Sequence, residues 1–110
     1  MKMIKKSRVV FADENLQKEF ENLSENNQIK EHIKRAVGDL QINAFSGIQI
    51  PKRLIPEVYI RRYRIDNPWK YDLPDGWRLV YSIISQNKVE ILSVILEWFN
   101  HRGYERRFNY

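Results

Sequence analysis

Two apolar runs, residues 76–85 and 89–96, constrain the fold of this chain more than any other feature. The first run is rich in β-branched and aromatic residues and begins at the end of a turn-like Pro74-Asp75-Gly76, which is typical of a β-strand. The second run is almost entirely apolar, as expected of a strand that is covered on much of both faces. Because only residues 86–88 connect the runs, the sequence predicts that the two strands pair as a hairpin.

A strand and two helices are predicted upstream of this hairpin. Residues 7–12 read as a short strand, and Asp13 follows as a plausible N-cap. Apolar residues then recur at helical spacing on either side of a polar break at residues 24–27, which offers a second N-cap. The short break favours an antiparallel helical hairpin. The apolar stripes are Leu16, Phe20 and Leu23 in the first helix, and Ile29, Ile33, Ala36, Val37 and Leu40 in the second.

The middle of the chain is less regular. Residues 44–56 contain Gly and Pro and are predicted to form a loop. Residues 57–65 are predicted to form a strand, and residues 66–75 a long connection in which 69–73 are either loop or a short extra hairpin arm. Residues 100–110 are expected to form one or two helical turns.

These elements predict a single α+β domain spanning residues 1–110. The order is β-α-α-β-β-β with a short C-terminal helix, and the four-stranded sheet is mostly antiparallel. The helical hairpin covers one face of the sheet. The other face is expected to stay open, and Arg61 and Arg78 are expected to meet there beside Tyr59 or Tyr63.

Charge and composition limit the function. The net charge is +5, there is no cysteine, and no apolar run is long enough to span a membrane, so a cytoplasmic location is expected. Basic residues gather in 51–64 and 100–110, whereas acidic residues cluster in 13–31. This asymmetry indicates either a polyanionic partner or an ordinary solvated basic surface.

Arginines alternate with aromatic residues in the basic stretches, a combination that suits single-stranded RNA. Trp77 and Tyr81 are expected in the core instead, because their parity matches Leu79 and Ile83. RNA can be cut without a metal when a base activates the 2′-OH, an acid protonates the 5′ oxygen and cations stabilise the transition state. Arginine is a poor base, and no phosphate-loop, dinucleotide or metal motif is present. We therefore expect no metal and no small-molecule cofactor.

Several of these segments together resemble the RelE/ParE toxin superfamily over nearly the whole chain. They are Tyr59-Ile60-Arg61, Gly76-Trp77-Arg78-Leu79-Val80-Tyr81, the run 89–96, and His101-Arg102-Gly103-Tyr104. The resemblance implies the toxin of a type II toxin–antitoxin pair. It further implies a metal-independent endoribonuclease that inhibits translation by cleaving mRNA in the A site of a 70S-type ribosome. The implied partners are the ribosome-bound mRNA and a cognate antitoxin protein.

The resemblance also implies site residues. The arginine of its Arg-Leu-Val-Tyr strand corresponds to Arg78, and its preceding basic position to Arg61, with Arg62 one register step away. The catalytic set is then Arg78, Arg61, Tyr104, His101 and Arg102, and the basic and aromatic residues expected to bind RNA are Tyr59, Arg62, Tyr63, Arg64, Arg106 and Arg107.

Two departures from the family pattern leave the general base unassigned. The connection 66–75 is longer than the short turn common in the family, and Tyr59 stands where some relatives carry a lysine. Two alternatives therefore stay open. One is a ParE-like inhibitor of DNA gyrase, and the other is a catalytically inactive relative that acts as a binding module.

Overall fold

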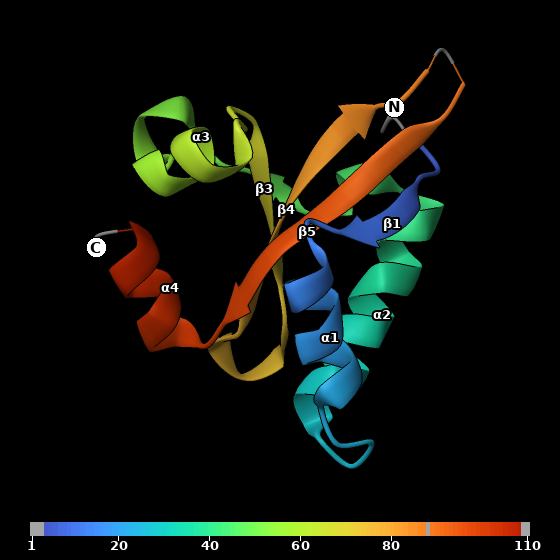
Figure 1. Cartoon of the computed structure of the whole chain (residues 1–110), viewed down its shortest axis with the longest axis vertical. Helices are drawn as coiled ribbons and strands as arrows, with labels where there is room; N and C mark the ends of the chain where they lie inside the picture. Colours follow the sequence, from blue (N-terminus) through green and yellow to red (C-terminus); the bar gives the residue numbers. More distant parts are fainter. Residues whose placement is uncertain (1–3, 88, 109–110) are drawn as a thin grey trace.

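The computed structural model describes residues 4–87 and 89–108, which form an α+β fold (Figure 1). Four α-helices accompany a five-stranded mixed sheet in this part of the chain. The strand order is β1-β5-β4-β3-β2, and only the β1–β5 pair is parallel. The strands are β1 (Arg8–Phe11), β2 (Ile48–Gln49), β3 (Pro68–Asp72), β4 (Arg78–Ser85) and β5 (Ile91–Phe99). The predicted hairpin is confirmed as β4 and β5.

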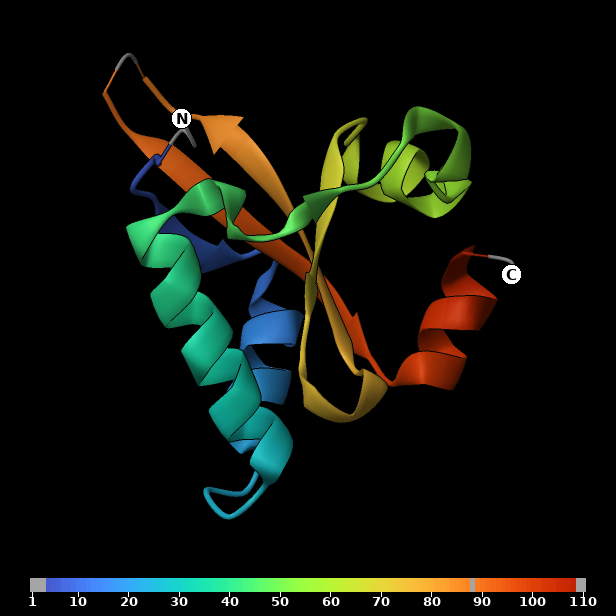
Figure 2. The same cartoon turned by 180° about the vertical axis from the view of Figure 1, so that it is seen from behind.

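The predicted helical hairpin is confirmed as α1 (Glu14–Asn22) and α2 (Gln28–Ile42). Asp13 caps α1 by accepting a hydrogen bond of 2.8 Å from the backbone N–H of Leu16. Asn27 caps α2 in the same way. Both helices lie on one side of the sheet, as the view from behind shows (Figure 2).

The first core fills the space between this hairpin and the sheet. Tyr81 is completely buried there, and Trp77 is partly buried against the same cluster, as their parity predicted. The Tyr81 hydroxyl donates to the Ala44 carbonyl at 2.7 Å and accepts from the Gly47 N–H, so its polar end is satisfied. The buried members of the cluster are Ile33, Ala36, Leu40, Leu73, Leu79, Tyr81 and Ile95.

The strand predicted over residues 57–65 is wrong, because this segment forms helix α3 (Glu57–Tyr63). Its residues interact at helical spacing: Arg61 pairs with Glu57 at 2.8 Å, and the rings of Tyr59 and Tyr63 lie 6.2 Å apart. Arg64 ends the helix in the left-handed conformation, with φ of 55°. A segment this short carries too few apolar positions to separate helical from strand periodicity.

The strand that does pair with β4 lies in the predicted connection. β3 occupies most of the segment left open as loop or hairpin arm, and β2 lies within the predicted loop 44–56. The sheet therefore has five strands rather than the predicted four. The turn Pro74–Gly76 joins β3 to β4 and places Asp72 directly opposite Arg78.

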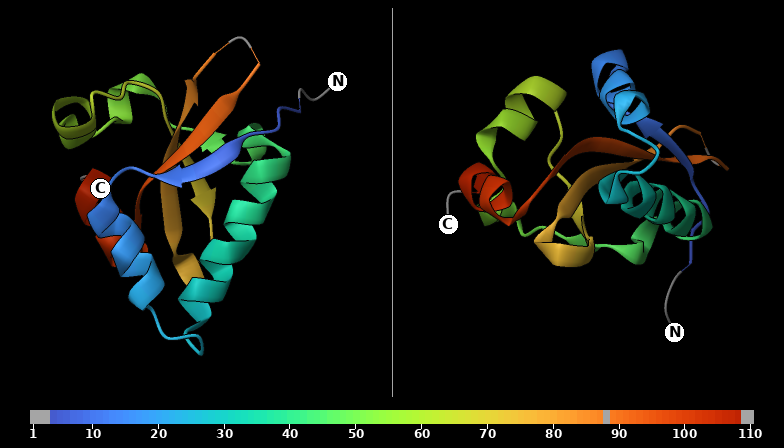
Figure 3. Two further views of the ribbon diagram at one scale, coloured as in Figure 1. Left: turned by 45° about the vertical axis from the view of Figure 1, so that its right-hand side comes forward. Right: turned by 90° about the horizontal axis from the view of Figure 1, so that it is seen from below.

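The second face, the side of the sheet away from α1 and α2, is not open as predicted. Helices α3 and α4 (His101–Phe108) pack on this side, whereas α1 and α2 pack on the other. Seen from below, α3 and α4 lie to the left and α1 and α2 to the right (Figure 3, right). A second core forms beneath them and includes Tyr59, which is completely buried. Its buried members are Ile50, Tyr59, Ile65, Val80, Leu96, Tyr104 and Phe108.

Candidate functional site

Arg78 lies at the first position of β4, at the edge of the second face. Its Nε is 2.9 Å from Oδ1 of Asp72, its partner across the β3–β4 pair, and its Nη1 donates to the Trp77 carbonyl at 3.2 Å. The Nε–H has no hydrogen-bond partner within the described part of the chain, so the contact with Asp72 is ionic. Only 20% of the Arg78 side chain is exposed, whereas Asp72 is half-exposed.

Lys70 brings a second cation to the same place. It precedes Asp72 by two residues in β3, so both side chains project from the same side of the strand. Its Nζ lies 3.6 Å from Oδ1 of Asp72. One carboxylate thus lies close to two cations.

The ring of Tyr104, on α4, lies against both cations. Its centre is 5.5 Å from the guanidinium carbon of Arg78 and 5.7 Å from Nζ of Lys70. These distances are in the range of cation–π contacts. Because Tyr104 is nearly buried, it supports the two cations from below.

The start of α4 packs against the β3–β4 turn. A Cβ atom built on Gly76 would lie 3.3 Å from Cβ of His101, and Gly76 has a positive φ of 80°. His101 is exposed, and its Nε2 is 2.5 Å from Oε1 of Glu105. We call Lys70, Asp72, Arg78, His101 and Tyr104 the basic cluster.

The predicted catalytic residues divide into two groups. Arg78 and Tyr104 come together in the basic cluster. His101 joins it only through its backbone position against Gly76, since its imidazole pairs with Glu105, and Arg102 follows on the exposed side of α4. Arg61 does not join them, because α3 does not pair with β4 and its side chain pairs with Glu57.

The residues expected to bind RNA are dispersed. Tyr59 is buried, and its hydroxyl donates to Oε2 of Glu97 at 2.6 Å. Burial and this hydrogen bond raise the pKa of Tyr59 far above its ordinary value. Arg107 binds both carboxylate oxygens of the same Glu97, at 3.0 and 2.6 Å. Arg64 and Arg106 are exposed.

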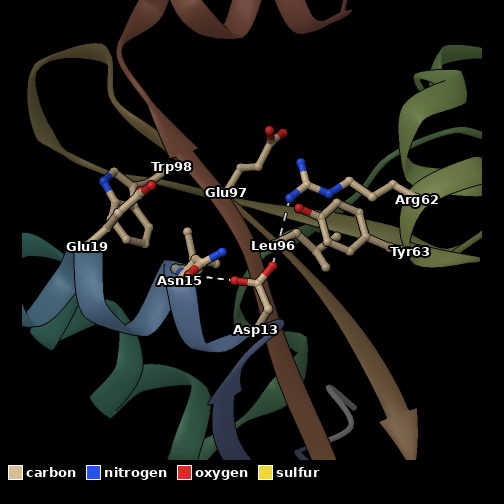
Figure 4. A pocket seen from close by; sticks show the side chains of 9 residues that line it. Asp13, Asn15, Glu19, Arg62, Tyr63, Leu96, Glu97 and Trp98 are labelled. Atoms are coloured by element: carbon tan, nitrogen blue, oxygen red, sulfur yellow. Dashed lines mark hydrogen bonds and ion pairs between the residues drawn. The ribbon is translucent and has the colours of Figure 1, made fainter.

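Arg62 and Tyr63 line a hollow of about 190 Å³, and Glu97 is also part of its lining. Figure 4 shows both side chains reaching from α3 toward Asp13, Glu97 and the end of β1. Arg62 is 3.9 Å from Asp13, a loose ion pair between exposed groups. The hollow has carboxylates of Asp13, Glu19 and Glu97 in its lining, so its charge does not suit a phosphate.

Sequence reasoning missed Lys70 and Asp72. Both lie in the segment that the sequence predicts to be either a loop or a hairpin arm. A signal was present, since Lys70, Asp72 and Arg78 fall on alternate positions on either side of a Pro-Asp-Gly turn. Reading that segment as a strand would have placed all three on one face.

No protein-family model, no curated protein and no solved structure matches this chain. Residues 4–87 and 89–108 contain no group of three or more His, Asp or Glu side chains placed to hold a metal ion. None of the helices described is long and apolar enough to cross a membrane.

Proposed function

We propose that this protein is the toxin of a type II toxin–antitoxin pair and cleaves ribosome-bound mRNA in the A site. The observation that carries the proposal is the juxtaposition of Arg78, Lys70 and Asp72 on adjacent strands, with Tyr104 beneath the two cations. One carboxylate can supply the base, and two cations the charge stabilisation, for 2′-OH attack on a phosphate. A ribosomal target would place the protein in the cytoplasm.

Each member of the basic cluster has a role in this reaction. The Asp72 carboxylate takes the proton from the 2′-OH, which no arginine can do at neutral pH. Arg78 and Lys70 stabilise the charge that develops on the phosphate oxygens. His101 protonates the leaving 5′ oxygen, because it is exposed whereas Tyr104 is nearly buried. The products are a 2′,3′-cyclic phosphate and a free 5′-OH, so atoms balance without added water.

The fold class supports the same proposal. The chain is α+β, its first strand is parallel to its last, and its helical hairpin lies on one face of the sheet. The number and order of the strands differ from those that the resemblance to RelE/ParE toxins implies, since residues 57–63 form a helix and β2 and β3 lie in the predicted loops.

The antitoxin is the proposed protein partner. An acidic segment would neutralise Arg78 and the exposed Arg102 and Arg106 on α4. Such a segment would compete with the RNA phosphate for the same cations, and binding would therefore block cleavage.

Primer extension on an mRNA translated by purified ribosomes tests the proposal. The wild-type protein should produce cuts within the A-site codon and only on ribosome-bound message, and Arg78→Ala should abolish them. Arg8→Ala serves as the matched control, because Arg8 is an exposed arginine on β1 that pairs with Glu90. Absence of cuts by the folded wild-type protein would overturn the proposal, and a gyrase supercoiling assay would then separate a ParE-like inhibitor from an inactive relative.

A further inference from the structure

We infer that Glu97 is a positioning residue that fixes α4 on β5 through Arg107 and so sets where Tyr104 and His101 lie relative to Arg78. The effect on cleavage rests on the proposed function, whereas the effect on α4 does not. Glu97 and Arg107 are not members of the basic cluster, so the proposed action of Glu97 is through the placement of α4.

A β-bulge turns Glu97 toward α4. Tyr81 pairs with Ile95 and Val80 pairs with Glu97, so Leu96 is an extra residue in β5. In regular alternation Glu97 would share a face with Ile95, inside the first core. The bulge instead places Glu97 on the second face together with Leu96. Since a bulge can re-aim a side chain, this irregularity gives the carboxylate its position.

The carboxylate of Glu97 joins three elements. Arg107 of α4 donates to both of its oxygens, and Tyr59 of α3 donates to Oε2. The Glu97 side chain is only 18% exposed and that of Arg107 is 37% exposed, so the carboxylate is the better shielded partner of the pair. A bidentate arginine–carboxylate pair fixes orientation as well as distance.

The position of α4 determines the position of the Tyr104 ring. Arg107 follows Tyr104 by three residues, which is almost one helical turn. The Tyr104 ring stacks on Phe108 at 4.4 Å and contacts Phe99 edge-on. The stack with Phe108 lies within α4, and the apolar contact with Phe99 is less directional than a bidentate ion pair. The bond between Arg107 and Glu97 is directional, and we therefore assign the register of α4 to it.

Two variants test this assignment, Glu97→Gln and Arg107→Met. Arg107→Met leaves the Tyr59–Glu97 bond in place and so guards against a general loss of folding. Hydrogen exchange of the α4 amides should become about tenfold faster in both variants, because a charged hydrogen-bonded pair is lost. Exchange in β4 and β5 should stay at the wild-type rate. Glu57→Gln is the matched control, since it removes an exposed pair with Arg61.

Cleavage kinetics separate positioning from a merely structural role. The kcat should fall by about 100-fold, as for a catalytic group displaced by an ångström, while KM changes little. Arg107→Lys, which keeps the charge but lacks the fork, should give an intermediate kcat.

Three outcomes decide between the claims. Wild-type exchange in α4 of Glu97→Gln would overturn the inference, and so would faster exchange with an unchanged kcat. Faster exchange in α4 together with a wild-type protein that cuts no RNA would uphold the anchoring of α4 by Glu97. The absence of cleavage by the wild-type protein would overturn the proposed function and leave the anchoring of α4 intact.

Discussion

The guanidinium carbon of Arg78 lies 5.5 Å from the centre of the Tyr104 ring, which links the first residue of β4 to the middle of α4. Lys70 lies 5.7 Å from the same ring. Two like charges over one ring repel each other, and Asp72 between them offsets that repulsion. An incoming phosphate can do the same, which would free the Asp72 carboxylate to accept a proton.

The role proposed for Asp72 predicts a specific kinetic defect. Asp72→Asn keeps the shape of the side chain but removes its basicity, so kcat for A-site cleavage should fall by about 100-fold or more. KM should change little or improve, since one negative charge beside the phosphate site is lost. Single-turnover cleavage on programmed ribosomes measures both quantities.

Asp75→Asn is the control for this variant. Asp75 lies in the turn between β3 and β4 with φ of 60°, a conformation that Asn also tolerates. Its cleavage rate should match the wild type. Equal rates for Asp72→Asn and wild type would exclude Asp72 as the base.

The sequence predicted the elements whose periodicity is long and regular. Helix α2 spans fifteen residues and carries a clear apolar stripe, and the pairing of β4 with β5 follows from their short connection. Helix α3 has seven residues, and there the same method failed. Strand β2 has two residues and carries no periodic signal at all.

The candidate site was predictable only in part for a similar reason. Arg78 and Tyr104 stand in recognisable segments, and the fold brings them together. Arginines interleaved with aromatics were interpreted as one RNA surface, yet Tyr59 is buried and Arg107 pairs with Glu97. Which rings lie in a core depends on the packing of two short helices, and this packing cannot be read from local pattern.

A buried lysine at the tip of the helical hairpin predicts a loss of stability. Nζ of Lys30 donates to the carbonyls of Glu21 and Leu23 at the end of α1 and to Oε1 of Glu25. Lys30→Met removes these bonds and should lower the free energy of unfolding by about 1.5–3 kcal/mol. Urea denaturation followed by circular dichroism measures the change.

Lys34→Met gives the comparison for that result. Lys34 also pairs with Glu25, but its side chain is 46% exposed, so its loss should cost about 0.5 kcal/mol or less. Equal losses in the two variants would show that burial of Lys30 does not matter. Cleavage should be unaffected in both, because neither lysine belongs to the basic cluster.

Tyr81 predicts a loss of stability at alkaline pH. Burial raises its pKa from 10.0 to about 12, despite the opposing hydrogen bond from Gly47. Between these values the unfolded chain releases a proton that the folded chain keeps. The contribution of Tyr81 to the free energy of unfolding is therefore constant below pH 10 and falls as pH rises to 12. The contribution of this residue is on the order of 2 kcal/mol.

Tyr81→Phe should abolish this part of the pH dependence. The variant loses the bonds to Ala44 and Gly47 and should be less stable at pH 7. The difference in free energy of unfolding between the variant and the wild type should shrink as pH approaches 12, because only the wild type loses stability through the Tyr81 hydroxyl. A difference that stays constant from pH 8 to 12 would contradict the role assigned to burial.

The cations of the basic cluster predict how binding depends on salt. Affinity for programmed ribosomes whose mRNA carries a 2′-deoxy sugar at the cleavage site reports binding without cutting. The slope of log affinity against log salt concentration should be steep and negative, because phosphate contacts release counterions.

Arg78→Ala and Lys70→Ala should each make this slope less negative by about 0.7, the value for one contact with a single strand. Arg61→Ala should leave the slope unchanged, because Arg61 pairs with Glu57 outside the cluster. A slope that responds to Arg61 and not to Arg78 would move the RNA surface from β3 and β4 to α3.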